Sequence, residues 1–168
     1  MIAPMRGRVA SAAVFLAVMV IGGAVLLSDP VQAGVLHGLS VAIARVSARV
    51  LGTVGFAVEQ RQQVIGTTDG LFRVSVENDC NGAWAHLILL ASVLAYPART
   101  RDKLMGLLVM QPALFVVNVV RIVSLFLVGL YALPLFRPTH VYVWQVLIVG
   151  CAIALFLGWV ERGAEPAA

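Results

Sequence analysis

Long stretches without a charged side chain dominate the pattern of apolar and polar positions along this chain. Residues 9–27 form the first, and a helix of about 19 residues crosses the ~30 Å hydrocarbon core of a bilayer. Comparable stretches follow Asp79, Lys103 and His140. The pattern predicts transmembrane segments over residues 9–27, 80–98, 104–133 (a span with an apolar extension) and 141–160.

The first stretch has two interpretations. Val31-Gln32-Ala33, with Gly34 next, is typical of a signal-peptidase site, and Arg6 and Arg8 precede the apolar residues. Because the stretch is longer than the roughly 7–15 residues usual in a signal peptide, we predict an uncleaved anchor, with a cleaved signal as the alternative. Either way, the chain after it emerges on the outer side.

Residues 31–51 carry apolar side chains at near-helical spacing, together with two arginines. Arg45 and Arg49 are four residues apart and share one helix face. A helix lying in the membrane interface would turn these arginines toward lipid phosphates, and we predict this arrangement. The alternative is a second spanning helix, which would bury both charges at considerable cost.

Residues 53–79 change to a β pattern. Apolar side chains alternate over residues 54–58 and again over 72–76, and the sequence Gly-Thr-Thr-Asp-Gly at 66–70 lies between them. Alternation on both sides of a turn-forming sequence is typical of a hairpin. We predict a small external β-hairpin that leads the chain to Cys80.

Composition supports a membrane protein, because 61% of the 168 residues are hydrophobic and 12% are charged. We predict a single all-α polytopic domain with about four or five transmembrane helices, one interfacial amphipathic helix and the β-hairpin. The net charge is +4, but the basic residues lie mostly in short flanks and loops, so we do not expect nucleic-acid binding.

Basic residues also predict the orientation. Arg99, Arg101 and Lys103 form a short loop, which the positive-inside rule places in the cytoplasm. We therefore expect a multi-pass protein of the cytoplasmic (inner) membrane of a bacterium, in contact with lipid.

Three chemically active side chains fall at one depth in this topology. At about 1.5 Å per residue, Cys80, Arg121 and His140 lie roughly 28, 27 and 32 Å from the charged residues at the cytoplasmic ends of their spans. Each length matches one hydrocarbon thickness of ~30 Å. The count places a thiol, a guanidinium and an imidazole at the outer interface, and it leaves open whether they touch.

Each residue also has an ordinary explanation. Such a cysteine often only fills space, such an arginine often reaches for phosphates, and such a histidine often caps a helix. The second cysteine, Cys151, lies near mid-bilayer, too deep to reach Cys80. An unpaired thiol facing an oxidising compartment is at risk, so we expect Cys80 to have a chemical role.

A thiol near an imidazole and a guanidinium suits acyl transfer on a peptide. His140 can accept the thiol proton and return it to a leaving amine, and Arg121 can donate to an oxyanion. Asn118 can orient that guanidinium or add a donor, and Gly82 allows close approach of a substrate backbone. One cysteine and one well-placed histidine are too few for zinc, so we expect no metal and no other cofactor.

The sequences Cys80-Asn81-Gly82, Asn118-Val119-Val120-Arg121 and His140, in this order between apolar helices, resemble the exosortase/archaeosortase family. The resemblance covers roughly residues 74–160 and is to the short forms, such as exosortase H. It implies a membrane cysteine transpeptidase with Cys80 as nucleophile and Arg121 and His140 as partners. It also implies that the substrates are exported proteins with a C-terminal sorting signal of motif, membrane helix and basic tail.

The chain departs from this family in two ways. Many members have about eight spans, and the usual small residues after the histidine are replaced here by Val141-Tyr142-Val143-Trp144. The second departure affects the expected shape of the substrate groove. His86 matches no catalytic position, and we expect it to form a hydrogen bond within the helix bundle.

The alternative function is non-enzymatic: a small membrane assembly or transport subunit. Small residues let helices approach closely, and Gly22, Gly23, Gly34 and Gly38 would then contact partner helices.

Overall fold

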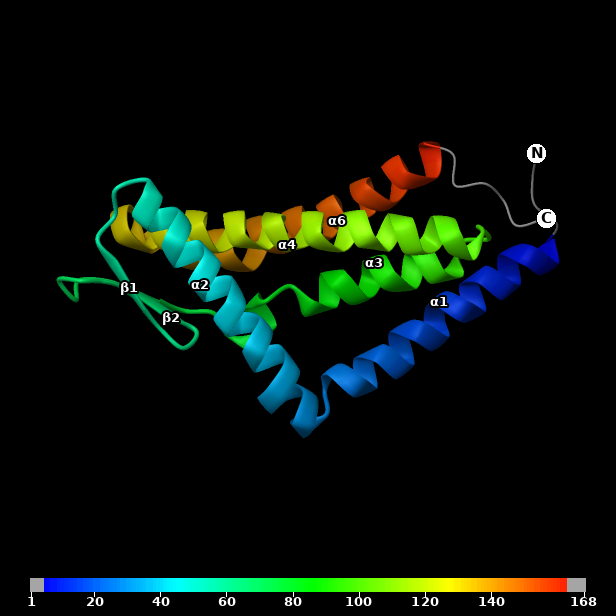
Figure 1. The fold of residues 1–168 in the computed structure, drawn as a ribbon, viewed down its shortest axis with the longest axis horizontal. Helices are drawn as coiled ribbons and strands as arrows, with labels where there is room; N and C mark the ends of the chain where they lie inside the picture. The colour runs from blue at the N-terminus through cyan, green and yellow to red at the C-terminus, as the bar shows by residue number, and fades with distance from the viewer. Residues whose placement is uncertain (1–4, 163–168) are drawn as a thin grey trace.

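The computed structural model describes residues 5–162, which are mostly helical (Figure 1). Its elements in chain order are α1 (Met5–Leu26), the π-helical turn η1 (Val31–Leu36), α2 (His37–Thr53), β1 (Val58–Arg61), β2 (Val64–Thr67), β3 (Arg73–Ser75), the 3-10 turn η2 (Asn78–Cys80), α3 (Ala83–Ala95), α4 (Thr100–Tyr131), α5 (Leu133–Pro138), the π-helical turn η3 (Thr139–Val143) and α6 (Trp144–Glu161).

Within residues 5–162, four helical segments are long and apolar enough to cross a membrane. They are Val9–Leu26, Val31–Thr53, Thr100–Tyr131 and Leu133–Glu161. Together with the small antiparallel sheet, they confirm the predicted class, a helical polytopic membrane protein with a minor β element. The chain is therefore a multi-pass membrane protein.

The helix in the predicted span 80–98 is shorter than the apolar stretch. α3 has 13 residues, about 20 Å of helix. It begins after Gly82, whose φ of 78° is left-handed, and it ends before Pro97. Proline disfavours a helical conformation at the residue before it, which explains the early end. Cys80 therefore lies in a separate turn rather than in the helix itself.

α2 crosses the second half of α4 and packs against it (Figure 1). Ile43, Ala44 and Leu51 face the core, while Arg45 and Arg49 are exposed. With a mean hydropathy of 1.3, Val31–Thr53 is the least apolar of the four long segments. The interfacial position of residues 31–51 stays a prediction, and the packing is compatible with it because neither arginine is buried.

The sheet predicted as a hairpin over residues 53–79 has three antiparallel strands in the order β1-β2-β3. Val64 lies opposite Arg61 on one side and opposite Ser75 on the other. The extra turn lies at Gln62, whose φ of 53° is left-handed. The sequence offers no Gly, Asn or Asp there, the residues that usually mark such a turn, so pattern analysis missed it.

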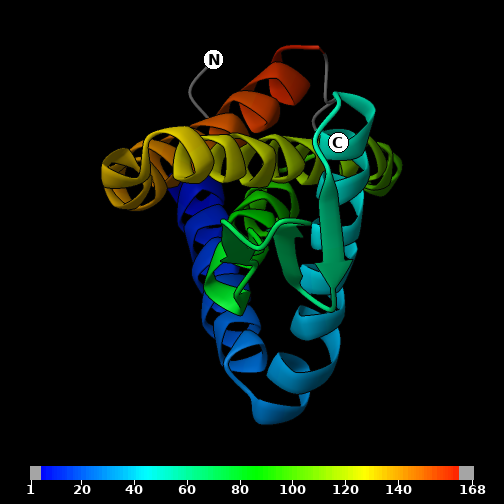
Figure 2. The ribbon, with the colours of Figure 1, turned by 90° about the vertical axis from the view of Figure 1, so that its left-hand side faces the viewer.

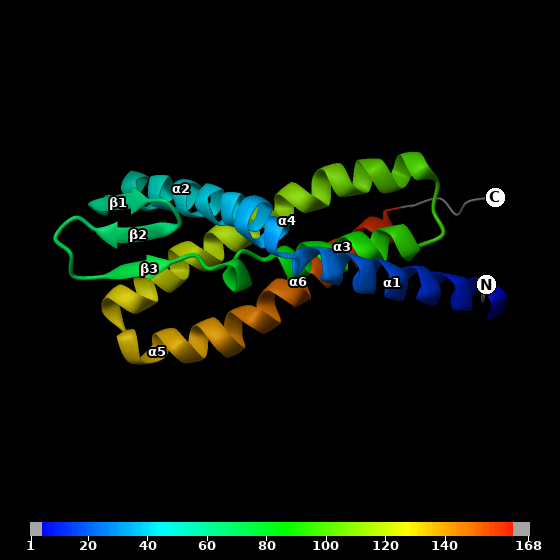
Figure 3. The same cartoon turned by 90° about the horizontal axis from the view of Figure 1, so that it is seen from below.

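Two apolar cores share α4. The first half of α4 packs with α3 and α6, and its second half packs with α2 and the sheet. Figure 3 shows the sheet gathered at one end of α4, and the end-on view in Figure 2 shows α3 between α1 and α4. With 32 residues, α4 is about 48 Å long and exceeds the ~30 Å hydrocarbon core. The buried polar residues Asn118 and Arg121 lie between the two cores.

Candidate active site

The structure brings Cys80 and His140 into direct contact. The Cys80 Sγ atom lies 2.9 Å from the His140 Nε2 atom, although 60 residues separate them in the chain. A neutral imidazole would accept this hydrogen bond from the thiol, and an imidazolium would donate it to a thiolate. Residue counting placed the two at one depth, and the structure shows that they also meet laterally.

A π-helical turn carries His140. η3 begins directly after Pro138, and it connects α5 to α6. Proline has no N–H and its ring crowds the preceding turn, so regular α-helical bonding is disturbed at this point. Single π turns within helices occur frequently at functional sites. The Phe136 ring, with its centroid 6.0 Å from that of His140, adjoins the imidazole.

Asn81 fixes the turn that carries Cys80. Its fully buried side chain donates to the Leu36 carbonyl and the Ser40 hydroxyl, both at 3.2 Å, and accepts from the Ala83 N–H at 3.0 Å. The Leu36 carbonyl lies at the end of η1, so this turn accepts a hydrogen bond from Asn81 and holds the cysteine turn in place.

Asn78 holds the other side of the same turn. Its Nδ2 atom donates to the backbone and side-chain oxygens of Gln32, at 3.1 and 2.7 Å, and its Oδ1 accepts from Ser40 at 3.3 Å. The sequence pattern predicted no hydrogen bonds for Asn78, Asn81, Gln32 or Ser40. Two asparagines flanking a cysteine could have marked a constrained turn, but their partners are about 40 residues away and leave no local pattern.

Arg121 is buried near the thiol without a carboxylate partner. Its side chain is 2% exposed, its Nε has no hydrogen-bond partner, and no ion pair joins it to a carboxylate in the described part of the chain. Its positive charge acts on Cys80. Because a buried guanidinium is costly without an anion, this position favours a thiolate or another developing negative charge nearby.

Asn118 and Gly82 pack against each other below the cysteine turn. Asn118 is fully buried, and neither its Oδ1 nor its Nδ2 atom has a hydrogen-bond partner. A Cβ on Gly82 would lie 3.3 Å from both Asn118 Cγ and Ile148 Cδ1. Tight packing and a positive φ therefore both favour glycine at this position, beside any role in substrate approach.

A cavity of about 240 Å³ adjoins the Cys80–His140 pair. The apolar part of its lining, here called the floor, consists of Val74, Ile122, Leu125 and Phe136, and residues 73, 75 and 77 add polar groups. Apolar lining with a few polar groups is typical of a site that binds organic ligands. The Cys80–His140 pair thus borders a space that can hold a few side-chain-sized groups of an organic ligand.

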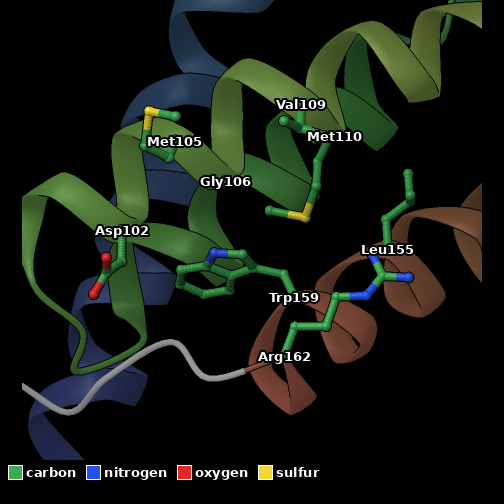
Figure 4. Close-up of a pocket in the computed structure, with 8 residues that line it drawn as sticks. All are labelled: Asp102, Met105, Gly106, Val109, Met110, Leu155, Trp159 and Arg162. Atoms are coloured by element: carbon green, nitrogen blue, oxygen red, sulfur yellow. The ribbon is translucent and has the colours of Figure 1, made fainter.

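A second cavity, of about 300 Å³, lies at the other end of the bundle (Figure 4). The Trp159 indole points toward Gly106, with Asp102 and Arg162 to either side. No cysteine or histidine lines it. In the described residues no cluster of His, Cys, Asp and Glu could hold a metal ion. The Cys80 cavity is the candidate active site because a thiol and an imidazole in contact with each other line it.

The remaining reactive side chains lie away from this site. His86 bonds through Nδ1 to the Gln111 Oε1 atom, which confirms the predicted hydrogen bond within the bundle. Cys151 is a free thiol on α6 and forms no disulfide with Cys80, which is also free.

Burial raises the pKa of the Cys80 thiol above its ordinary value. The Arg121 charge opposes this shift, and Asp79 and Glu77 reinforce it. The Cys80 thiol therefore holds its proton more tightly than an ordinary cysteine does. If this sulfur acts as a nucleophile it needs a base, and His140 Nε2 is the group in hydrogen-bond contact with it.

We expect alkylation of Cys80 by a membrane-impermeant maleimide to accelerate with pH and to keep accelerating above about 8.5, the ordinary thiol pKa, because the pKa is raised. His140→Ala removes the proton acceptor and should slow labelling about ten-fold at pH 7. The measurement is adduct formation by mass spectrometry on Cys151→Ala protein. A rate that levels off below pH 8, or that is unchanged in His140→Ala, would contradict this assignment.

A match to a known family agrees with the geometry of the Cys80–His140 site. No curated protein and no solved structure matches the chain. A family model described as transmembrane exosortase (Exosortase_EpsH) matches residues 1–158, nearly the whole sequence. The chain therefore belongs to the transmembrane exosortase family.

Proposed function

We propose that this protein is an integral-membrane cysteine protease and transpeptidase that cleaves C-terminal sorting signals from exported proteins. The observation that carries the proposal is the 2.9 Å contact between Cys80 Sγ and His140 Nε2, with the unpaired guanidinium of Arg121 buried nearby. Nucleophile, base and oxyanion donor are the groups that acyl transfer requires. Members of the exosortase family are generally cysteine transpeptidases, in agreement with this chemistry.

In the proposed mechanism, Cys80 Sγ attacks the scissile carbonyl while His140 Nε2 takes the thiol proton. The oxyanion of the tetrahedral intermediate accepts hydrogen bonds from Arg121, and the unpaired amide of Asn118, three residues earlier on α4, is available as a further donor. Collapse breaks the C–N bond as His140 gives its proton to the leaving amine. An acceptor amine or water then attacks the thioester, His140 takes its proton, and the thiol is restored.

Family membership supports the proposed substrates. Exosortases imply exported proteins of the PEP-CTERM type, in which a short motif precedes a membrane helix and a basic tail. With the loop of Arg99, Arg101 and Lys103 in the cytoplasm, Cys80 lies at the outer face of the inner membrane, beside the place where such a motif leaves the bilayer. The basic tail would then remain on the cytoplasmic side.

The test is co-production with an exported reporter that ends in such a signal, taken from the same genome. We expect the reporter to lose its helix and tail, measured as a lower intact mass, and a reporter with a scrambled motif to stay whole. An uncleaved reporter beside abundant, inserted protein would contradict the enzymatic function.

A non-enzymatic subunit would give that negative result. For this alternative, Gly22 and Gly23 already pack against Leu87 and Trp84 of the same chain, whereas Gly34 and Gly38 have open space beside them. Substituting leucine at the latter pair should then disturb partner co-purification, and Cys80 substitutions should not.

A further inference from the structure

β3 is an edge strand with one side unpaired. The sheet order is β1-β2-β3, so β3 bonds to β2 alone. The Thr67 N–H donates to the Phe72 carbonyl and the Val76 N–H donates to the Gln63 carbonyl. Antiparallel bonding repeats every second residue, so Val74 also bonds to β2 while the N–H and C=O groups of Arg73 and Ser75 point away from it.

These outward groups have no hydrogen-bond partner in the described part of the chain. Proteins usually protect an open edge, because its row of unsatisfied donors and acceptors can pair with another strand. Here the open edge lines the cavity that also contains Cys80 and His140. Cys80 and the unpaired edge of β3 therefore border the same cavity.

The cavity walls fit an extended chain better than a helix. A strand laid along β3 would place alternate side chains on opposite faces of the sheet. The cavity lining offers both kinds of partner, the apolar side chains of Ile122, Leu125 and Phe136 and the polar side chain of Glu77. A volume of about 240 Å³ holds only a few side chains, which suits a short peptide segment.

We propose that the outer edge of β3 binds the peptide substrate as an added strand, through main-chain hydrogen bonds at Arg73 and Ser75. The inference rests on the proposed function, and it assigns the bound class as an extended peptide with one apolar side chain in the floor. Main-chain pairing supplies affinity and the floor supplies selectivity, as in other cases of strand addition. The pairing holds the scissile segment beside Cys80 Sγ.

The probe is acetyl-Ala-Val-Ala chloromethyl ketone, applied to full-length Cys151→Ala protein in lipid nanodiscs. The Cys80 sulfur displaces chloride from the methylene carbon, and the thiol proton passes to His140. Three analogues each carry one N-methyl group, at successive amides. Because an edge strand pairs with every second residue, we expect neighbouring positions of the methyl group to differ about ten-fold in alkylation rate, in alternation.

Two proline variants test the strand itself. Ser75→Pro removes an N–H that points into the cavity without breaking a bond to β2, and proline is tolerated in edge strands at such positions. Gln60→Pro is the matched control, because the Gln60 N–H points outward from the opposite edge of the sheet. We expect the alternation to disappear in Ser75→Pro and to persist in Gln60→Pro.

Equal rates for all three analogues on Cys151→Ala protein would overturn the proposal, as would unchanged alternation in Ser75→Pro. Chloroacetamide, which makes no strand contacts, reports on folding: if its rate changes in Ser75→Pro, the N-methyl series alone decides. The probe contains no sorting signal. If the reporter is cleaved but the alkylation rates do not alternate, only the proposal of strand pairing is wrong. If the rates alternate but the reporter stays whole, only the proposed sorting function is wrong.

Discussion

Cys80→Ala is expected to abolish reporter cleavage while the protein remains inserted and abundant. Removing a catalytic nucleophile costs on the order of 10⁶-fold in rate, because no thioester can form. Cys80 is half-buried, and its side chain bonds only to His140 among the described residues, so little of the fold depends on it. The measurement is the ratio of cleaved to intact reporter, normalised to the amount of membrane-inserted protein.

The second cysteine provides a matched control. Cys151 lies within α6, away from the Cys80 cavity, so Cys151→Ala should cleave the reporter at the rate of the unaltered protein within about two-fold. Cys80→Ser should be nearly as inactive as Cys80→Ala, because a hydroxyl is far harder to deprotonate than a thiol. Normal cleavage by Cys80→Ala would show that this sulfur is not the nucleophile.

The positions of most long apolar helices could be predicted from uncharged stretches of the sequence, but residues 80–98 contain only the 13-residue helix α3, and Val31–Thr53, which was expected in the interface, is one of the four long apolar segments. Helix rise converts residue number into distance along a helix. Counting from the cytoplasmic ends placed Cys80 and His140 at one level without knowledge of the packing. Their lateral contact could not be counted, because it depends on how α3, α4 and α6 pack together. The sequence pattern indicates how far along a helix a residue lies, but it does not indicate which residues of other helices contact it.

The features that sequence analysis missed are those set by distant partners. Asn78 and Asn81 bond to Gln32 and Leu36 in η1 and to Ser40 in α2. The additional strand depends on a left-handed Gln62, a residue that does not normally mark a turn. In both cases tertiary structure decides a conformation that local propensity leaves undecided.

The packing around Gly82, Asn118 and Arg121 could be predicted only in part. Gly82 was expected to admit substrate, whereas the structure shows that a Cβ there would press on Asn118 and Ile148. Asn118 and Arg121 were expected on neighbouring faces of one helix, and they do lie between the two apolar cores. Their spacing of three residues predicted that they share one side of the helix. It did not predict that both side chains would be buried with unpaired polar atoms.

Arg121→Gln is expected to lower kcat/KM for reporter-derived peptides about 10²–10³-fold, the usual cost of losing an oxyanion donor. The effect should fall on kcat, since this interaction strengthens as the oxyanion develops. Arg121→Lys keeps the charge but loses the planar donor fork, so its kcat/KM should lie between that of the unaltered protein and that of Arg121→Gln. Anchoring of a substrate carboxylate would instead raise KM and leave kcat nearly unchanged.

Arg137→Gln is the control for charge alone. Arg137 is exposed in α5, near the same end of the bundle, so its substitution should change kcat/KM by less than about two-fold. The amount of inserted Arg121→Gln protein should not fall, because a buried charge without a partner contributes a desolvation cost that glutamine removes.

The thiol reports on Arg121 independently of any substrate. Burial raises the pKa of Cys80 and the guanidinium opposes that rise, so Arg121→Gln should raise the pKa further. The pH profile of maleimide labelling would then move to higher pH in Arg121→Gln and stay in place in Arg137→Gln. A loss of kcat without this shift would separate oxyanion binding from thiol activation, and a shift without loss of kcat would mean that Arg121 acts on the sulfur alone.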